Sequence, residues 1–171
     1  MRSLVLLLAA VGVSLPAQPL KLDLTRLEAK ASDKVNISLN RGTLQLASAF
    51  LDGKDAEEAQ AKKLIEGIDP LDVRNFEFKT PGVWTQADLD GVRNQLRPPE
   101  WSRLVGYSST EDGETAEVYV RQVKHKTLGI AVVTAEAKEL TVVSIAGQID
   151  LDSLTELSGH FGVPKLERKQ K

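Results

Sequence analysis

Two neighbouring apolar runs decide the fold: "LGIAVVTA" at residues 128–135 and "ELTVVSIAG" at residues 139–147. Each run has the length and the β-branched composition of a β-strand. Both alternate faces of Leu128–Thr134 and of Leu140–Ile145 are largely apolar, which is typical of central strands that are covered on at least one face. Because only a short linker, "AEAK", separates the runs, we expect them to pair as antiparallel neighbours.

The segments before these runs extend the sheet. "WSRLVGYSS" at 101–109 and "AEVYVRQV" at 116–123 are also strand-like, and Asp112-Gly113 between them is a hairpin signal. Four strands with short connections predict a C-terminal four-stranded antiparallel meander. One or two N-terminal strands are expected to join it, at 35–39 and within "LDVRNFEFK" at 71–79.

Helices are predicted in the N-terminal part of the chain. Thr25 and Glu28 have capping-box spacing at the start of a short helix over about 25–31. "GTLQLASAFLDGKDAEEAQAKKLIEGI" at 42–68 predicts two helices broken at Asp52-Gly53. Thr85 and Asp88 have a variant capping-box spacing before an apolar stripe, and Pro98-Pro99 ends that helix. The stripe consists of Leu89, Val92 and Leu96. We therefore predict an α+β, two-layer protein with helices packed on one face.

The N-terminus "MRSLVLLLAAVGVSLPAQ" has the three-part pattern of a secretory signal peptide. Its apolar core, residues 4–13, is shorter than the roughly 20 residues of a membrane span. We expect a signal peptide over residues 1–17, cleaved after Ala17, and a single α+β domain over residues 18–171. The expected location is periplasmic or secreted, with no stable membrane span after cleavage.

Charge and cysteine content exclude several classes of function. The net charge is −2 and becomes −3 when residues 1–17, which carry only Arg2, are removed. This mildly acidic balance gives no reason to expect nucleic acid as a partner. The chain has no cysteine. It therefore has no disulfide, lipoprotein cysteine, thiolate nucleophile or cysteine-ligated metal.

The most motif-like stretch is "QIDLDSLTELSG" at 148–159. Asp150 and Asp152 precede a capping-box pair, Ser153 and Glu156, so they fit the first turn of a helix, where the dipole favours carboxylates. The alternative is a calcium site. That site would need a third ligand, a central glycine and a terminal glutamate at EF-hand spacing, which this stretch lacks. The two aspartates are therefore predicted to be architectural.

Other polar and aromatic residues also have structural interpretations. His125 and His160, the only histidines, lack metal-binding patterns, although a Ser-His-Asp triad assembled in space stays an alternative. A cluster of four acidic residues lies beside lysines, which predicts a solvated helix face. The four residues are Asp52, Asp55, Glu57 and Glu58. Trp84 and Trp101 are expected to pack against other apolar residues rather than to bind a ligand. The N-glycosylation sequon at 36–38 lies in a predicted strand and is not expected to be used. We thus predict no catalytic residue, no cofactor and no metal, and the sequence identifies no binding residue.

Several stretches resemble a bacterial domain-of-unknown-function family, number 4252. They are "LDLTRLEAKASDKVNISLN", "VRNFEF", "ADLDGVRNQL", "WSRLV" and "KELTVVSIAGQIDLDSLTELSGHFGVP", and the resemblance covers about residues 22–164. It implies an exported, uncharacterised envelope protein. Many members carry a lipoprotein cysteine, which this chain lacks, and some are encoded near extracytoplasmic sigma factors. The resemblance therefore implies a link to envelope signalling.

The leading functional hypothesis is an exported, non-enzymatic cell-envelope module that binds a protein or takes part in signalling. The alternative is a small carrier or sensor of an apolar ligand in the periplasm. A third hypothesis is a hydrolase whose site is assembled in space. The expected partner is thus an unknown envelope protein or a small apolar ligand.

Overall fold

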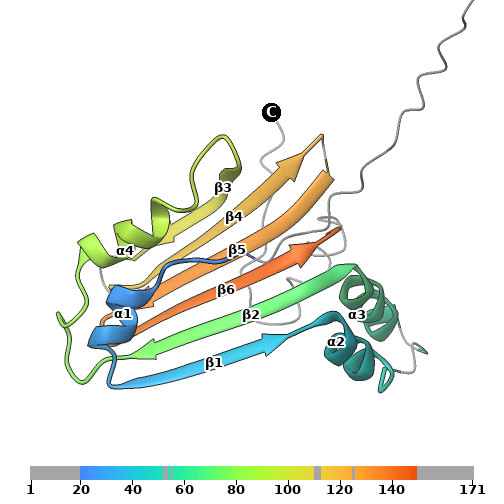
Figure 1. The fold of residues 1–171 in the computed structure, drawn as a ribbon, viewed down its shortest axis with the longest axis horizontal. Coiled ribbons are helices and arrows are strands. Elements are labelled where there is room, and N and C mark those ends of the chain that lie inside the picture. Colours follow the sequence, from blue (N-terminus) through green and yellow to red (C-terminus); the bar gives the residue numbers. More distant parts are fainter. Residues whose placement is uncertain (1–19, 52–53, 55, 110–112, 125, 150–171) are drawn as a thin grey trace, which may run out of the picture.

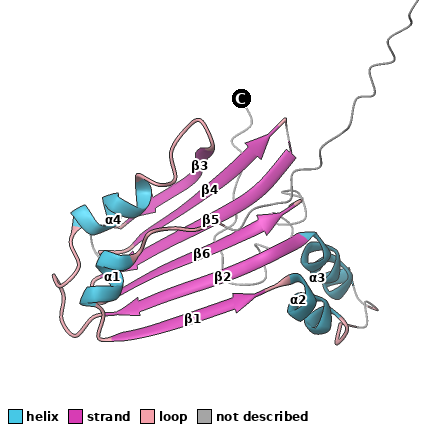
Figure 2. Cartoon of the chain, in the orientation of Figure 1, coloured by secondary structure: helices cyan, strands magenta, loops and turns pink. Residues whose placement is uncertain are grey.

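The structure is a computed structural model that describes residues 20–51, 54, 56–109, 113–124 and 126–149, with only the backbone at 56 and 57. Figures 1 and 2 show its helices and its single sheet. In chain order the elements are α1 (Thr25–Lys30), β1 (Asp33–Leu39), α2 (Arg41–Ser48), α3 (Ala56–Gly67), β2 (Ile68–Glu77), α4 (Gln86–Arg93), β3 (Trp101–Ser108), β4 (Thr115–Val123), β5 (Lys126–Glu136) and β6 (Glu139–Gly147).

The six strands form one antiparallel sheet with the order β1-β2-β6-β5-β4-β3 (Figure 1). The strands β3 to β6 are neighbours in chain order, and β2 pairs with β6 on the other side. The two apolar runs at residues 128–135 and 139–147 lie in β5 and β6, and both strands are in the interior of the sheet. Their predicted central position is confirmed.

The predicted α+β class is confirmed, but the layout differs from the predicted one. The sheet has six strands, because β2 pairs with β6 along most of its length and brings β1 with it. The polar residues Asp72, Arg74 and Asn75 gave no sign that β2 is an interior strand. The helices are also not confined to one face, since Leu64 of α3 packs against a cluster separate from the core beneath α1 and α4.

The main core lies between the sheet and helices α1 and α4. Leu27 of α1 and Leu89 and Val92 of α4 are almost fully buried against side chains of the sheet. Strands β2 to β6 contribute residues of one face of the pleated sheet. These are Phe76, Trp101, Tyr119, Ala131, Val133, Ala135, Leu140 and Val142.

Of the three predicted capping boxes, the one at Thr85 forms, the one at Thr25 does not, and the one at Ser153 lies outside the described residues. In α4, the Thr85 N–H and hydroxyl both donate to Asp88 Oδ2 at 2.8 Å, and Lys30 Nζ at the end of α1 lies 2.6 Å from the same oxygen. In α1, no capping box forms. Asp23 takes that role, because its Oδ1 accepts from the Thr25 N–H at 3.1 Å and from the Thr25 hydroxyl at 2.7 Å. The carboxylate two residues before the helix thus replaces Glu28.

The predicted pair of helices between residues 42 and 68 is confirmed as α2 and α3. Asn40 caps α2, since its Oδ1 accepts from the Thr43 N–H at 3.0 Å. Asp52 and Gly53, where the break was placed, lie outside the described residues. Within the described parts of the chain, none of the helices has the length and apolar character needed to cross a membrane.

Candidate functional site

Several predicted candidates fall outside the described residues. These are Asp52, Asp55, His125, Asp150, Asp152 and His160. The helix-start interpretation of Asp150 and Asp152 therefore stays a prediction. Glu57 and Glu58 lie in α3, as predicted, and the side chain of Glu58 is partly buried. The described residues contain no group of three or more His, Cys, Asp or Glu side chains placed to hold a metal ion.

Both tryptophans pack, as predicted. Trp101 is 4% exposed and belongs to the main core. Trp84 packs at the edge of this core, and its Nε1 donates to the backbone oxygen of Glu136 at 2.9 Å. Asn36, the first residue of the sequon, lies in β1 with an exposed side chain, so the strand prediction is confirmed there.

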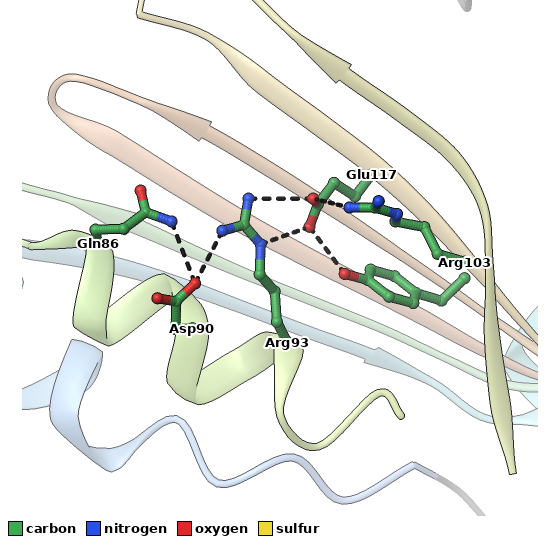
Figure 3. Close-up of polar contacts among 6 residues, drawn as sticks. Gln86, Asp90, Arg93, Arg103 and Glu117 are labelled. Carbon is green, nitrogen blue, oxygen red and sulfur yellow. Dashed lines mark hydrogen bonds and ion pairs between the residues drawn. The ribbon is translucent and has the colours of Figure 1, made fainter. Parts of the chain in front are cut away.

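Sequence reasoning missed a buried carboxylate on β4. Glu117 is 3% exposed and faces α4 (Figure 3). Its carboxylate accepts from both Nε and Nη2 of Arg93, at 2.9 and 3.1 Å, and from Arg103 Nη1 at 3.2 Å. The hydroxyl of Tyr119 donates to Oε2 at 2.9 Å. One carboxylate therefore joins α4, β3 and β4.

Helix α4 fixes the position of Arg93 in this cluster. Its Nη1 donates to Asp90 Oδ1 at 2.9 Å, three residues earlier in the helix. The Nε2 of Gln86 donates to the same oxygen of Asp90 at 3.2 Å (Figure 3). The guanidinium thus bridges an exposed carboxylate on the helix and the buried one on the sheet, in a fork geometry that suits arginine.

Hydrogen bonding in the cluster fixes the charge state of its members. Burial by itself would raise the pKa of Glu117, but the bonds from Arg93, Tyr119 and Arg103 outweigh it and hold that pKa below its ordinary value of 4.5. Burial, together with the bond to Glu117, raises the pKa of Tyr119 to about 12. Glu117 is therefore ionised and Tyr119 protonated near neutral pH. General acid–base catalysis works best with a pKa near the working pH, so these groups suit a structural role.

A cavity of about 460 Å³ lies on the helix side of the sheet, above β2 and β6. Leucines 20, 22 and 24 and Val142 provide its apolar part. Its polar lining consists of Lys21, Glu28, Asp72, Arg74 and Ser144. Asp72 Oδ1 accepts from the hydroxyl of Ser38 at 2.5 Å. The cavity has the volume of a small-molecule site, but half of its lining is polar.

The opposite face of the sheet carries a row of branched aliphatic side chains that crosses all six strands. Strand pairing places directly opposed residues in this order: Ile37, Val73, Val143, Val132, Val118 and Val105. We call these six residues the aliphatic row. Ile37 is 43% exposed, and the other five are partly exposed. The row therefore lies outside the core beneath α1 and α4.

Two further rows flank the aliphatic row, and the three rows together are called the uncharged face. One flanking row is Val35, Asn75, Thr141, Thr134, Ala116 and Tyr107. The other is Leu39, Leu71, Ile145, Ile130, Val120 and Ser102. No position in the three rows is charged. Leu64 of α3 packs at the end of this face where Val120 and Ile130 lie.

The polarity of β1 and β2 is the reverse of that in a sheet with one solvated face. Such a sheet places apolar residues toward its helices and polar residues outward. Here Lys34 and Asn36 of β1 and Asp72 and Arg74 of β2 share the face of Phe76, which packs beneath α1 and α4. The outward side of β1 carries Val35, 47% exposed, and Ile37. On the outward side, the charges of the paired residues of β1 and β2 are confined to one end, at the pair Asp33 and Glu77.

The sequence contains a partial signal for the Glu117 cluster and for the aliphatic row. Glu117 alternates with apolar residues in "AEVYV", and a carboxylate at an inward position requires cationic partners. Its partners, however, lie 14 and 24 residues away, so spacing could not identify them. Apolar residues on both faces of β5 and β6 were recognised, but the row across six strands depends on strand order and register.

The fold and these surfaces define a class: an α+β protein built on one antiparallel sheet, with α1 and α4 over one face and an uncharged, largely aliphatic opposite face against which α3 packs at one end. The chain belongs to DUF4252, described as a domain of unknown function, whose match spans residues 29–157, more than half of the chain. The resemblance in the sequence is thereby confirmed. Comparisons with curated proteins and with solved structures give no match.

Proposed function

We propose that this protein is an exported, non-enzymatic module of the cell envelope that binds a partner protein through the uncharged face. The aliphatic row carries this proposal. Six opposed aliphatic side chains, all at least partly exposed, leave a continuous apolar strip across the sheet. Contiguous apolar surface of this kind marks interaction sites in monomeric proteins.

The dimensions of the face favour a partner of substantial size. Six strands about 4.8 Å apart span roughly 29 Å, and five residues along each strand span about 17 Å, so the face projects to roughly 490 Å². A single helix, about 10–12 Å in diameter, covers about two strands. A face six strands wide therefore fits a sheet or about three helices of a partner protein.

The chemistry of the face indicates what the partner offers. Its three rows contain aliphatic, threonine, asparagine, serine, alanine and tyrosine side chains and no charge. A charged partner surface would lose its hydration there without gaining an ion pair. We therefore expect an apolar, uncharged partner surface.

Export and a non-enzymatic role have separate support. The N-terminal pattern with Arg2 and an apolar core at 4–13 supports export. The ionised Glu117 is fully engaged by Arg93, Arg103 and Tyr119, which supports a structural use of the most buried carboxylate in the described residues.

A single charge on the uncharged face tests the binding proposal. Ile37→Lys is expected to reduce recovery of one defined envelope protein at least tenfold, because a lysine ammonium would be desolvated at the interface. The measurement is affinity capture of the tagged mature protein from envelope extract, quantified by mass spectrometry.

Asn36→Lys is the matched control, since it adds the same charge to the helix side of the same strand. It is expected to recover that protein like the wild type. Equal recovery with Ile37→Lys and with the wild type would contradict the proposal.

The cavity beside Arg74 favours a second candidate function, a small-ligand carrier. Its volume of about 460 Å³ suits a small molecule. No hydrogen bond or ion pair within the described residues engages the guanidinium of Arg74, which can therefore hold an anionic group against the leucine wall. The ligand that fits is amphiphilic with an acidic head, which refines the expected apolar ligand.

Native mass spectrometry tests this second function. Protein purified from its own envelope is expected to carry an added small-molecule mass. Arg74→Met, which keeps an unbranched apolar stem and removes the guanidinium charge, is expected to lose this mass. Wild-type protein with no added mass would contradict the carrier function.

A further inference from the structure

Strand β1 is an edge strand, and of the usual devices that protect edges it has only charged side chains, Asp33 and Lys34. Among the described strands it pairs only with β2, so its outer side presents backbone N–H and C=O groups to solvent or to another chain (Figure 1). Natural proteins protect such edges with bulges, prolines or inward charges. The opposite edge, β3, has a register shift between Arg103 and Val105.

The pairing of β1 with β2 is regular by contrast. Seven consecutive residue pairs, from Asp33↔Glu77 to Leu39↔Leu71, form without a register shift. The strand "DKVNISL" contains no proline. Val35 and Ile37 on its outward face are 47% and 43% exposed. A regular, exposed and partly apolar edge of this kind is competent to pair with another strand.

We propose that β1 pairs antiparallel with β1 of a second copy of this chain, about a two-fold axis at Asn36. Because the axis is perpendicular to the sheet, a side chain that points outward in one copy also points outward in the other. Residues directly opposite each other across the axis therefore lie on the same face of the sheet. Their residue numbers must then sum to an even value. Pairing centred on Asn36 uses the whole strand and is isologous, as expected for a closed dimer.

This register makes the strand complementary to itself. It places Val35 opposite Ile37 on the outward face, so two exposed aliphatic side chains meet across the axis. It places Lys34 opposite Ser38 and Asp33 opposite Leu39, so no like charges face each other. The registers centred on Val35 and on Ile37 pair only five residues.

The dimer would form one sheet of two copies with the uncharged face continuous across both. Val35 and Ile37, the most exposed members of that face on β1, would lie side by side at the centre. This inference goes beyond the proposed function and does not depend on it, because it uses the edge of β1 and not the broad face.

Single cysteines test the register, because the chain has none of its own. Opposed residues of antiparallel strands have Cα atoms about 4.5–5.5 Å apart, within the range of a disulfide. Asn36→Cys is therefore expected to form a disulfide-linked dimer under mild oxidation, measured by non-reducing electrophoresis of the mature protein.

Lys34→Cys and Ser38→Cys are the matched controls, both on the same face of β1. In each single variant, the cysteine of one copy and the same cysteine of the other copy are four residues apart along the strands, or about 14 Å. Each variant alone is therefore expected to stay uncrosslinked. A mixture of the two variants is expected to crosslink. Equal crosslinking of Asn36→Cys and Lys34→Cys, or none by Asn36→Cys, would overturn the inference.

Light scattering after size exclusion gives an independent readout. The wild type is expected at twice the monomer mass, and Asn36→Lys at the monomer mass, since two lysines would meet at the axis. Wild-type protein that is monomeric at all concentrations would overturn the inference. Asn36→Lys that is monomeric but still captures the envelope protein separates this dimer from the partner-binding face.

Discussion

Glu117→Ala is expected to lower the free energy of unfolding by about 3–5 kcal/mol, measured by urea denaturation at pH 7. The carboxylate is 3% exposed and is the common acceptor of Arg93, Arg103 and Tyr119. Its removal leaves the buried Tyr119 hydroxyl without this acceptor and leaves Arg93, 25% exposed, without its partner on the sheet. Uncompensated buried donors of this kind account for the size of the loss.

The pH dependence separates the charge of Glu117 from its packing. Because its pKa in the folded protein lies below the ordinary 4.5, its contribution to stability is present above pH 4.5 and is lost as pH falls through the folded pKa. Glu117→Gln removes the titrating group and keeps the shape. The stability gap between wild type and Glu117→Gln should be constant above about pH 5.5 and narrow below 4.5. A gap that does not change with pH would contradict an ionised Glu117.

Gly147→Ala is expected to destabilise the protein by about 2–5 kcal/mol, because two costs combine. The residue ends β6 with a φ of 135°, a region that side chains other than glycine rarely adopt. A Cβ at this position would also overlap the backbone oxygen of Gly67, where α3 meets β2. Thermal or urea denaturation would show the loss.

Gly91→Ala is the matched control within the same protein. Gly91 lies inside α4, and a Cβ there would meet no atom within 4 Å. Alanine has the higher helix propensity, so this change should stabilise the protein by about 0.5–1 kcal/mol. Opposite signs for the two substitutions are expected. A neutral Gly147→Ala would contradict the close contact of β6 with the start of β2.

Local patterns in the sequence predicted most of the elements correctly. The capping box of Thr85 and Asp88 marked α4, and the alternation of Val35, Ile37 and Leu39 marked β1, because both signals lie within a few residues. The capping box at Thr25 was wrong because Asp23, two residues earlier, competes for the same N–H group. Local spacing cannot rank two acceptors of comparable reach.

Features that depend on pairing could not be predicted in this way. The partners of Glu117 come from α4 and β3, and the aliphatic row comes from six strands whose order departs from chain order at β2 and β6. A shift of one residue in any register would move that strand's contribution to the other face. The row is therefore a property of the assembled sheet.

The distribution of charged and aliphatic residues on β1 and β2 is the basis for proposing that the aliphatic row binds a partner. Charged residues such as Arg74 face the helix side, and exposed aliphatic residues such as Ile37 face outward. Opposed aliphatic side chains stabilise neighbouring strands of any sheet, but this pairing does not require the exposure of Val35 and Ile37. The proposed contact with an apolar partner surface would account for that exposure.

Photocrosslinking in the envelope tests this central claim most directly. A photoreactive phenylalanine derivative at position 37 or at position 105 places the probe at either end of the aliphatic row. The same probe at position 34 samples the helix side of β1. One shared envelope protein is expected to crosslink from positions 37 and 105 and not from 34, identified by mass spectrometry. Crosslinks from 37 and 105 that reach only residues 150–171 of the same chain, or no protein at all, would contradict this claim.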